Sequence, residues 1–275
     1  MDLGNNDSVE IPVTQVSIQE AHERIGPYIH RTPVFTCSAI NDLAGCEIFF
    51  KPENLQKVGA FKMRGAVNAA LSLPAAELAK GLATHSSGNH AQALALTARS
   101  LGVPAYVVMP RTSPQQKVGA VRGYGGEITF CEPTLAARES TLDAIVEKTG
   151  ATFIHPFDNW DVVAGQATAA KELIEDKEDL DSLIAPVGGG GFLAGTSLAV
   201  KHFSPETLVF GAEPEGAADA VLSIASGHVE SAPYINTIAD GLLTTLSAKT
   251  LSVIREEVQE ILLVSDADII HAMRL

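Results

Sequence analysis

Short apolar runs alternate with longer amphipathic stretches along most of the chain. The apolar runs are rich in Val, Ile, Phe and Leu and predict β-strands at residues 46–51, 81–86, 105–110, 126–131, 151–156, 181–187, 207–213 and 260–265. The stretches between them predict helices at residues 61–73, 89–101, 114–122, 134–149, 160–175 and 191–203. Alternation of this kind is typical of α/β proteins, in which mainly parallel sheets are flanked by helices.

The region between residues 76 and 157 contains four strand and helix units in succession. We expect these residues to form a small domain inserted within a larger sheet, so that residues 1–75 and 158–275 form a large domain. The chain has no internal repeat and no low-complexity linker that would mark this boundary in its composition.

The composition indicates an ordinary globular protein that acts on small molecules. The chain has 275 residues, of which 46% are hydrophobic and 19% charged, so it can bury a full core. Its net charge of -14 and the absence of a basic stripe argue against nucleic-acid binding. Cys37, Cys46 and Cys131 have neither disulfide-type nor zinc-type spacing, which fits a reducing cytoplasm. The start "MDLGNNDSVEIP" predicts a loose arm rather than a signal peptide, and no apolar run is long enough for a membrane span.

Two polar or glycine-rich turns follow predicted strands, where ligands bind in α/β sheets. In "HSSGNHAQA", residues 85–93, the turn through Gly88 offers backbone N–H groups and short polar side chains to an anion. The alternative is a simple Ser or Asn N-cap on an ordinary turn. In "APVGGGGFLAG", residues 185–195, four successive glycines precede a helix and favour a phosphate site over a flexible turn. This turn has neither the Walker ending nor the dinucleotide-binding pattern.

Lys62 lies in "KVGAFKMRGA", residues 57–66, where a helical pattern begins. A lysine at such a junction is most often a solvated surface charge. Its neighbours Gly59, Ala60 and Phe61, together with the two turns, instead favour a desolvated amine suited to Schiff-base chemistry. A phosphorylated aldehyde cofactor would need all three features.

With these motifs, the sequence resembles the fold-type II pyridoxal-phosphate enzymes, and within them the serine racemase and serine/threonine dehydratase group. The resemblance runs from "IHRTPVFT" to the last residue and rests on "FKMRGA", "SSGNHAQA", "PVGGGG", "AEPEGAADA" and "TIADGL", in the family's order and approximate spacing. It implies a tryptophan synthase β-like fold with two domains, each with a mainly parallel sheet flanked by helices.

The resemblance also implies the roles of individual residues. Lys62 is expected to hold pyridoxal 5'-phosphate as an internal aldimine, Phe61 to lie beside the ring and Asn89 to bond the ring hydroxyl. The phosphate is expected on Gly188, Gly189, Gly190 and Gly191. The substrate carboxylate is expected in the turn of Ser86, Ser87, Asn89 and His90. Arg138, in "AARES", matches a family arginine that can approach this carboxylate, although by sequence alone it reads as a solvated helix charge.

The implied reactions are racemisation and ammonia-lyase (dehydratase) chemistry on small hydroxy amino acids such as serine and threonine. Lys62 can take the Cα proton, after which loss of a β-hydroxyl gives a keto acid and ammonia, and return of a proton on the opposite face gives the other enantiomer. Ser87 distinguishes these outcomes, because "SSGN" resembles racemase-like members in which the second serine faces the ring opposite the lysine. The same match covers relatives that dehydrate 3-hydroxyaspartate, so elimination is the primary expectation and racemisation is permitted.

A divalent cation and a homodimer are further implications of the resemblance. Glu213, the carbonyl of Ala217 and Asp219 match the family's cation site, which suits Mg²⁺, Ca²⁺ or Mn²⁺ equally; without the resemblance these acids would read as surface residues. Some racemases of the group bind a nucleotide at the subunit interface, but the matching residues are scattered here, and a nucleotide effector is left open.

The final stretch "DADIIHAMRL" lies in an apparent amphipathic helix without a glycine cap. Members of the group continue for about fifty residues, including a serine that meets the pyridine nitrogen, and the resemblance therefore predicts a C-terminally shortened chain of uncertain activity. A non-catalytic cofactor-binding or regulatory chain is one alternative. β-Replacement, as in cysteine synthases, is disfavoured because those enzymes resemble a different asparagine loop and lack the Glu213, Ala217 and Asp219 set.

Overall fold

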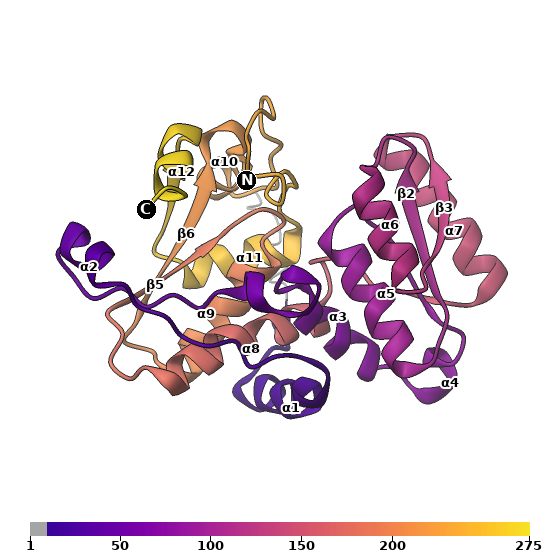
Figure 1. Ribbon diagram of the computed structural model, residues 1–275, viewed down its shortest axis with the longest axis horizontal. Coiled ribbons are helices and arrows are strands. Elements are labelled where there is room, and N and C mark those ends of the chain that lie inside the picture. The colour runs from indigo at the N-terminus through magenta and orange to yellow at the C-terminus, as the bar shows by residue number, and fades with distance from the viewer. Residues whose placement is uncertain (1–9) are drawn as a thin grey trace, which may run out of the picture.

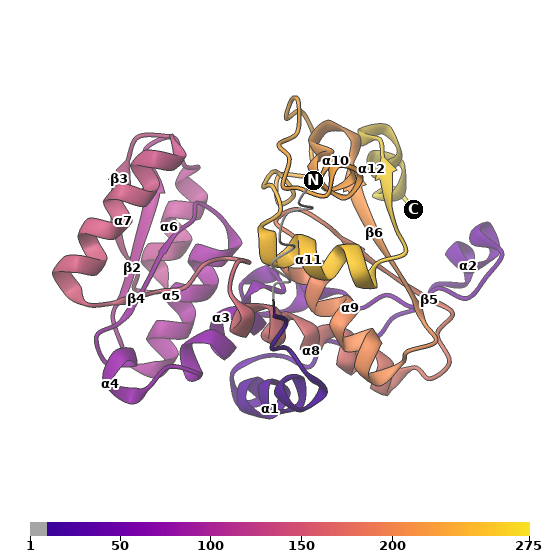
Figure 2. The same ribbon diagram turned by 180° about the vertical axis from the view of Figure 1, so that it is seen from behind.

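The structure of the protein is a computed structural model that describes residues 10–275, and Figures 1 and 2 show it from opposite sides. Most of the predicted N-terminal arm lies outside the described residues. The chain forms two parallel sheets, each covered by helices, with helix α3 between the two groups of elements (Figure 1). This arrangement confirms the predicted fold class.

The first sheet is built from four parallel strands in the order β3-β2-β1-β4. Its strands are β1 (Leu82–His85), β2 (Ala105–Pro110), β3 (Glu127–Cys131) and β4 (Thr152–Phe153). Parallel neighbours need long crossover connections. These are helices α5 (Asn89–Leu101), α6 (Gln115–Gly123) and α7 (Leu135–Thr149). All four residues of β1 are buried, as expected for a strand covered on both faces.

The second sheet has three parallel strands in the order β5-β6-β7. They are β5 (Ser182–Pro186), β6 (Leu208–Pro214) and β7 (Glu260–Val264). The helices of this half are α8 (Trp160–Asp176), α9 (Gly191–Phe203), α10 (Asp219–Ser226), α11 (Ala248–Glu257) and α12 (Asp266–Ala272). A large apolar cluster that includes Val163, Leu193 and Ile254 holds these helices on the sheet.

The N-terminal elements connect the two halves. They are helices α1 (Gln15–Ile25), α2 (Ser38–Ala44), α3 (Lys62–Leu71) and α4 (Ala75–Leu78) and the 3-10 turns η1 (Gly26–Tyr28), η2 (Glu53–Leu55) and η3 (Lys57–Gly59); a fourth turn, η4 (Glu215–Ala217), follows β6. Helix α3 packs closely on α8, because a Cβ at Gly165 would lie 2.7 Å from the carbonyl oxygen of Arg64. This contact fixes the helix that begins with Lys62.

Most elements lie where the sequence predicts them, but the strand predicted at residues 46–51 is wrong. Only Phe50 forms a β-bridge there, with Phe35. The apolar run "CEIFFK" has strand composition, yet a strand requires a continuous hydrogen-bonded neighbour, and the described chain provides one at a single position. The first sheet lies within residues 76–157 and the second beyond residue 158, while their division into separate domains stays a prediction. None of the helices within residues 10–275 is long and apolar enough to cross a membrane.

Candidate active site

Lys62 is the first residue of helix α3, and a strained turn leads the chain into it. Val58 and Gly59 both have positive φ, 59° and 70°, and a β-branched residue rarely adopts this conformation. The ammonium nitrogen of Lys62 donates to the carbonyl oxygen of Pro156 at 3.0 Å and lies 5.0 Å from the centre of the Phe61 ring. Burial lowers the pKa of Lys62 to about 8, so that a substantial fraction of the amine is neutral just above neutral pH.

The four-glycine turn lies beside this amine, at the N-terminus of α9. One pocket is lined by Phe61, Lys62, all four glycines and Phe192, and also by Gly241, Leu242 and Thr244. The N-cap of α9, Gly190, has a φ of 81° and makes no side-chain capping bond. The first N–H groups of this helix are therefore available to an anion.

Side chains on these glycines would destroy the turn. A Cβ at Gly189 would lie 2.4 Å from the ring of Phe157, and one at Gly188 would lie 3.1 Å from the Cα of Leu242. Bare backbone facing an amine, a helix N-terminus and no acidic side chain in the lining fit a phosphorylated aldehyde. The residues present therefore fit pyridoxal phosphate.

The predicted substrate turn follows strand β1 and leads into α5. Ser86 accepts a hydrogen bond from the N–H of Gly88 at 3.3 Å, and Gly88, the N-cap of α5, makes no side-chain capping bond. The simple N-cap interpretation of this turn therefore does not describe the structure. Ser87 is half-buried and Asn89 is exposed, and neither side chain bonds to Lys62 within the described residues, so their predicted roles stay predictions.

His90, in the first turn of α5, is buried near Lys62. Its Nε2 lies 3.0 Å from the carbonyl oxygen of Ile154, while its Nδ1 is buried without a partner among residues 10–275. Burial, followed by the charge of Lys62, lowers the pKa of His90 to about 3. The imidazole is thus neutral, and because a carbonyl only accepts, its free Nδ1 is an acceptor rather than a donor for a carboxylate.

The loop between β4 and α8 was not recognised in the sequence as part of the site. Pro156 accepts the hydrogen bond from Lys62, and Phe157 packs against the glycine turn. The Nδ1 of His155 accepts from the N–H groups of Phe157 and Asp158 at 3.3 and 2.8 Å, and burial lowers its pKa to about 4. The run "ATFIHP" reads as an apolar strand, so only its proximity in space reveals this role. Leu242 and Thr244 were also missed, although the motif "TIADGL" lies next to them.

The predicted cation ligands lie together in a buried region at the end of β6. Glu213 accepts hydrogen bonds from the N–H groups of Ala220 and Val221 at 2.7 and 3.2 Å, and Asp219 accepts one from Leu246 at 3.2 Å. Burial raises the pKa of Glu213 to about 7 and that of Asp219 to about 6. No cluster of three or more His, Cys, Asp or Glu side chains within residues 10–275 is arranged for a metal, and the predicted set has only two such side chains.

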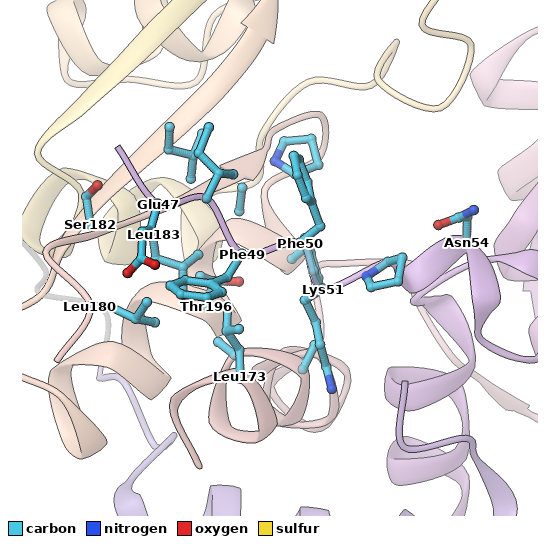
Figure 3. Close-up of a pocket in the computed structure, with 18 of the residues that line it drawn as sticks. Glu47, Phe49, Phe50, Lys51, Asn54, Leu173, Leu180, Ser182, Leu183 and Thr196 are labelled. Carbon is cyan, nitrogen blue, oxygen red and sulfur yellow. The ribbon is translucent and has the colours of Figure 1, made fainter. Parts of the chain in front are cut away.

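A larger cavity, of about 700 Å³, lies between residues 46–54, strand β5 and helices α8 and α9 (Figure 3). It shares Pro186 and Phe192 with the lining of the Lys62 pocket. The labelled side chains around it are mainly apolar, including Phe49, Leu180 and Leu183. Because no titratable cluster of the described chain converges on it, we place the candidate active site at Lys62.

Comparisons with known proteins agree with this assignment. Residues 25–275 match the family described as pyridoxal-phosphate dependent enzyme. The chain is 51% identical over 265 residues to the serine racemase of Dictyostelium discoideum, a match that covers 96% of this chain and 82% of that protein. It is 49% identical over 255 residues to the beta-hydroxyaspartate dehydratase of Paracoccus denitrificans, covering 93% and 81%.

Solved structures give the same result. Maize serine racemase superposes with a TM-score of 0.93 at 42% identity, covering 95% of this chain and 80% of that one. A bacterial-type threonine deaminase, from the source abbreviated T.th., superposes with a TM-score of 0.89 at 44% identity, covering 95% and 85%. The similarity thus extends over both sheets and the pocket between them.

Proposed function

This chain belongs to the family of pyridoxal-phosphate dependent enzymes, and we propose on that basis that it racemises and dehydrates small hydroxy amino acids, with serine as the reference substrate. The similarity to serine racemases and to a threonine deaminase supports this substrate class. A dehydratase of 3-hydroxyaspartate is the second candidate, supported by the similarity to the Paracoccus enzyme.

The observation that carries the proposal is the position of the Lys62 amine against the glycine turn. The same pocket contains an amine of lowered pKa and the uncapped N-terminus of α9. We assign the covalent attachment of the cofactor to Lys62, its phosphate to Gly188–191 and its ring to a place beside Phe61. Phe61 already stacks on Phe192 with ring centres 4.3 Å apart, which provides a flat apolar surface.

When bound, pyridoxal phosphate withdraws electrons from the Cα of the substrate and so makes its proton acidic. Lys62 is suited to remove that proton, because burial has already lowered its pKa toward the operating range of a general base. The hydrogen bond from its nitrogen to Pro156 holds the amine in place. We assign the substrate carboxylate to the N–H groups at the start of α5, with Ser86, Ser87, Asn89 and His90 around it.

Racemisation requires a second proton-transfer group on the face opposite Lys62. We assign this role to Ser87, which follows the end of β1 and lies in the turn before α5. Elimination needs no such group, so the two activities separate at this residue. The alternative of a non-catalytic cofactor-binding chain predicts bound cofactor without either activity.

We also propose a divalent cation at Glu213, Asp219 and the carbonyl of Ala217. Two carboxylates that are 1% and 2% exposed carry a large penalty for ionisation, and a cation would offset it. Mg²⁺, Ca²⁺ and Mn²⁺ all suit such oxygen ligands, with water completing the shell.

The remaining proposals concern assembly and location. We propose a homodimer, a nucleotide effector as an open possibility, and a large domain of residues 1–75 and 158–275 around a small domain of residues 76–157. Free thiols at Cys37, Cys46 and Cys131 are compatible with the reducing cytoplasm.

The test compares the protein with Lys62→Ala and with the matched control Lys57→Ala. We expect purified protein to show the visible absorbance of covalently bound cofactor, to release pyruvate from L-serine and to form D-serine, as measured by a coupled assay and chiral chromatography. Lys62→Ala should abolish all three signals, whereas Lys57→Ala, which changes a nearby lysine outside the pocket lining, should retain them. Covalent cofactor in Lys62→Ala would exclude the assignment, and bound cofactor in an inert parent would favour the non-catalytic alternative.

A further inference from the structure

We propose that Arg138 and His85 together bind a second carboxylate of the substrate, so that the site is built for amino dicarboxylic acids with a β-hydroxyl group. This inference rests on the proposed function and selects between its two substrate classes. The two residues come from different elements: His85 ends strand β1, and Arg138 lies in the first turn of α7.

Helix α7 brings Arg138 to the edge of the sheet where ligands bind. The helix crosses back over the sheet after β3, so its first turn lies at the carboxyl ends of the parallel strands. Leu142, one turn after Arg138 on the same face, is 2% exposed and packs with Ala83 and Val108. Arg138 therefore projects from the sheet-facing side of α7 rather than from its solvent side, contrary to a solvated helix charge.

The guanidinium of Arg138 has no counter-ion in the part of the chain that the structure describes. Within residues 10–275 its side chain forms no ion pair and no hydrogen bond, and its Nε is shielded from solvent. The exposed acids Glu139 and Asp143 lie on the same helix but do not pair with it. A shielded donor without a partner is unfavourable, and a planar guanidinium pairs best with a carboxylate through two parallel hydrogen bonds.

His85 provides the second unpaired group. Its side chain is 9% exposed, and its Nδ1 is buried without a hydrogen-bond partner in residues 10–275. Burial, followed by the charge of Arg138, lowers the pKa of His85, which Glu139 and Asp143 partly oppose. The effect of Arg138 shows that the two side chains are close. A neutral imidazole adds a hydrogen-bond donor without a charge, and Arg138 adds the charge.

The pair is connected to the reaction site by a short path. His85 directly precedes Ser86 in the proposed carboxylate turn. Its ring lies 6.1 Å from that of His155, which lies 4.6 Å from Phe157, and the carbonyl of the intervening Pro156 accepts from Lys62. A four-carbon amino dicarboxylic acid could thus place one carboxylate at the start of α5 and the other at Arg138 and His85. Serine has no group for the second position, which would leave Arg138 unpaired.

Activity ratios test the proposal in the holoenzyme. The parent, Arg138→Gln, Arg138→Lys, His85→Phe and the control Arg122→Gln are assayed for ammonia release from L-serine and from both diastereomers of 3-hydroxyaspartate. We expect the better hydroxyaspartate diastereomer to exceed L-serine in kcat/KM. Arg138→Gln should lower kcat/KM for hydroxyaspartate about 100-fold and that for L-serine less than about 3-fold, with partial recovery in Arg138→Lys. His85→Phe should lower the hydroxyaspartate value about 10-fold, and Arg122→Gln should change neither substrate.

A binding measurement separates this inference from the proposed function. Succinate should raise the melting temperature of the holoenzyme at concentrations where propionate, which has one carboxylate, does not, and Arg138→Gln should remove the difference. Equal losses on serine and hydroxyaspartate would overturn the proposal, since Arg138 would then bind the carboxylate that both substrates share. Equal effects of succinate and propionate would also overturn it. If the parent reacts with neither amino acid, the proposed function fails, while the succinate difference still decides this inference.

Discussion

Replacing Arg64 with methionine should lower the free energy of unfolding by about 3–5 kcal/mol. The Arg64 side chain is fully buried two residues after Lys62, between Glu53 and Glu172. Its Nε and Nη2 donate to Glu53 at 2.7 and 2.8 Å, and its Nη1 and Nη2 donate to Glu172 at 2.8 and 2.9 Å. Methionine fills the volume but leaves both buried carboxylates without this cation.

The two carboxylates differ in what remains to them. Glu172 keeps an ion pair with Lys51 at 2.7 Å, whereas Glu53 keeps only the hydroxyl of Thr32, also at 2.7 Å. Most of the loss therefore comes from Glu53, which is 8% exposed and pairs with no second cation among residues 10–275. A loss of about 3–5 kcal/mol is a large part of the roughly 5–15 kcal/mol typical of a folded protein. We thus expect a marginally stable variant in which α3 holds Lys62 less firmly.

The pH dependence gives the same network a sign. Burial raises the pKa of Glu172, but hydrogen bonds from His22 and Arg64 lower it further, so the net pKa lies well below the ordinary value of 4.5. A carboxyl with a lowered folded-state pKa adds stability above its ordinary pKa and loses it as the pH falls. Arg64→Met should therefore flatten the loss of stability below about pH 5.

Urea unfolding of the parent, Arg64→Met, Glu53→Gln and the double variant measures these effects. The double variant should be at least about 1 kcal/mol more stable than the sum of the two single losses predicts, because no Glu53 charge remains to be buried alone. Arg99→Met, which changes an exposed arginine, is the control. A loss below about 1 kcal/mol in Arg64→Met, or strict additivity in the double variant, would refute the reasoning.

Three further predictions concern the site. Asp219→Ala should remove any rise in melting temperature with Mg²⁺ that the parent and the exposed control Glu215→Ala show, and a retained response would exclude Asp219 as a ligand. Ser87→Ala should lower D-serine formation from L-serine at least about 100-fold and block elimination from D-serine, yet spare most pyruvate formation from L-serine; an equal fall of both L-serine activities would make Ser87 a carboxylate-binding residue instead. Because burial lowers the pKa of His155 from 6.5 to about 4, the folded state should lose stability as the pH falls between these values. His155→Asn, which keeps an acceptor for the two N–H groups, should lose less, and an identical acid profile by circular dichroism would contradict this.

Local chemistry in the sequence was sufficient for the architecture and for several candidate residues. A strand followed by glycines and a helix exposes backbone N–H groups wherever it occurs, so the turn at Gly188–191 could be predicted without a fold. The order of strands and helices likewise followed from periodicity, because period two and period 3.6 are properties of the local backbone. Lys62 was found because its small and aromatic neighbours are adjacent in the chain.

The tertiary structure decided everything that depends on contacts between distant residues. Pro156 meets Lys62 across 94 positions, and Glu172 meets Arg64 across 108. Neither pairing leaves a periodic signal, since burial and hydrogen-bond partners are set only when helices pack. Arg138 reads as a surface charge in the sequence and becomes a shielded, unpaired cation of the described chain only when α7 lies on the sheet. Conversely, the apolar run at residues 46–51 has the composition of a strand, but a strand exists only where a neighbouring backbone completes its hydrogen bonds.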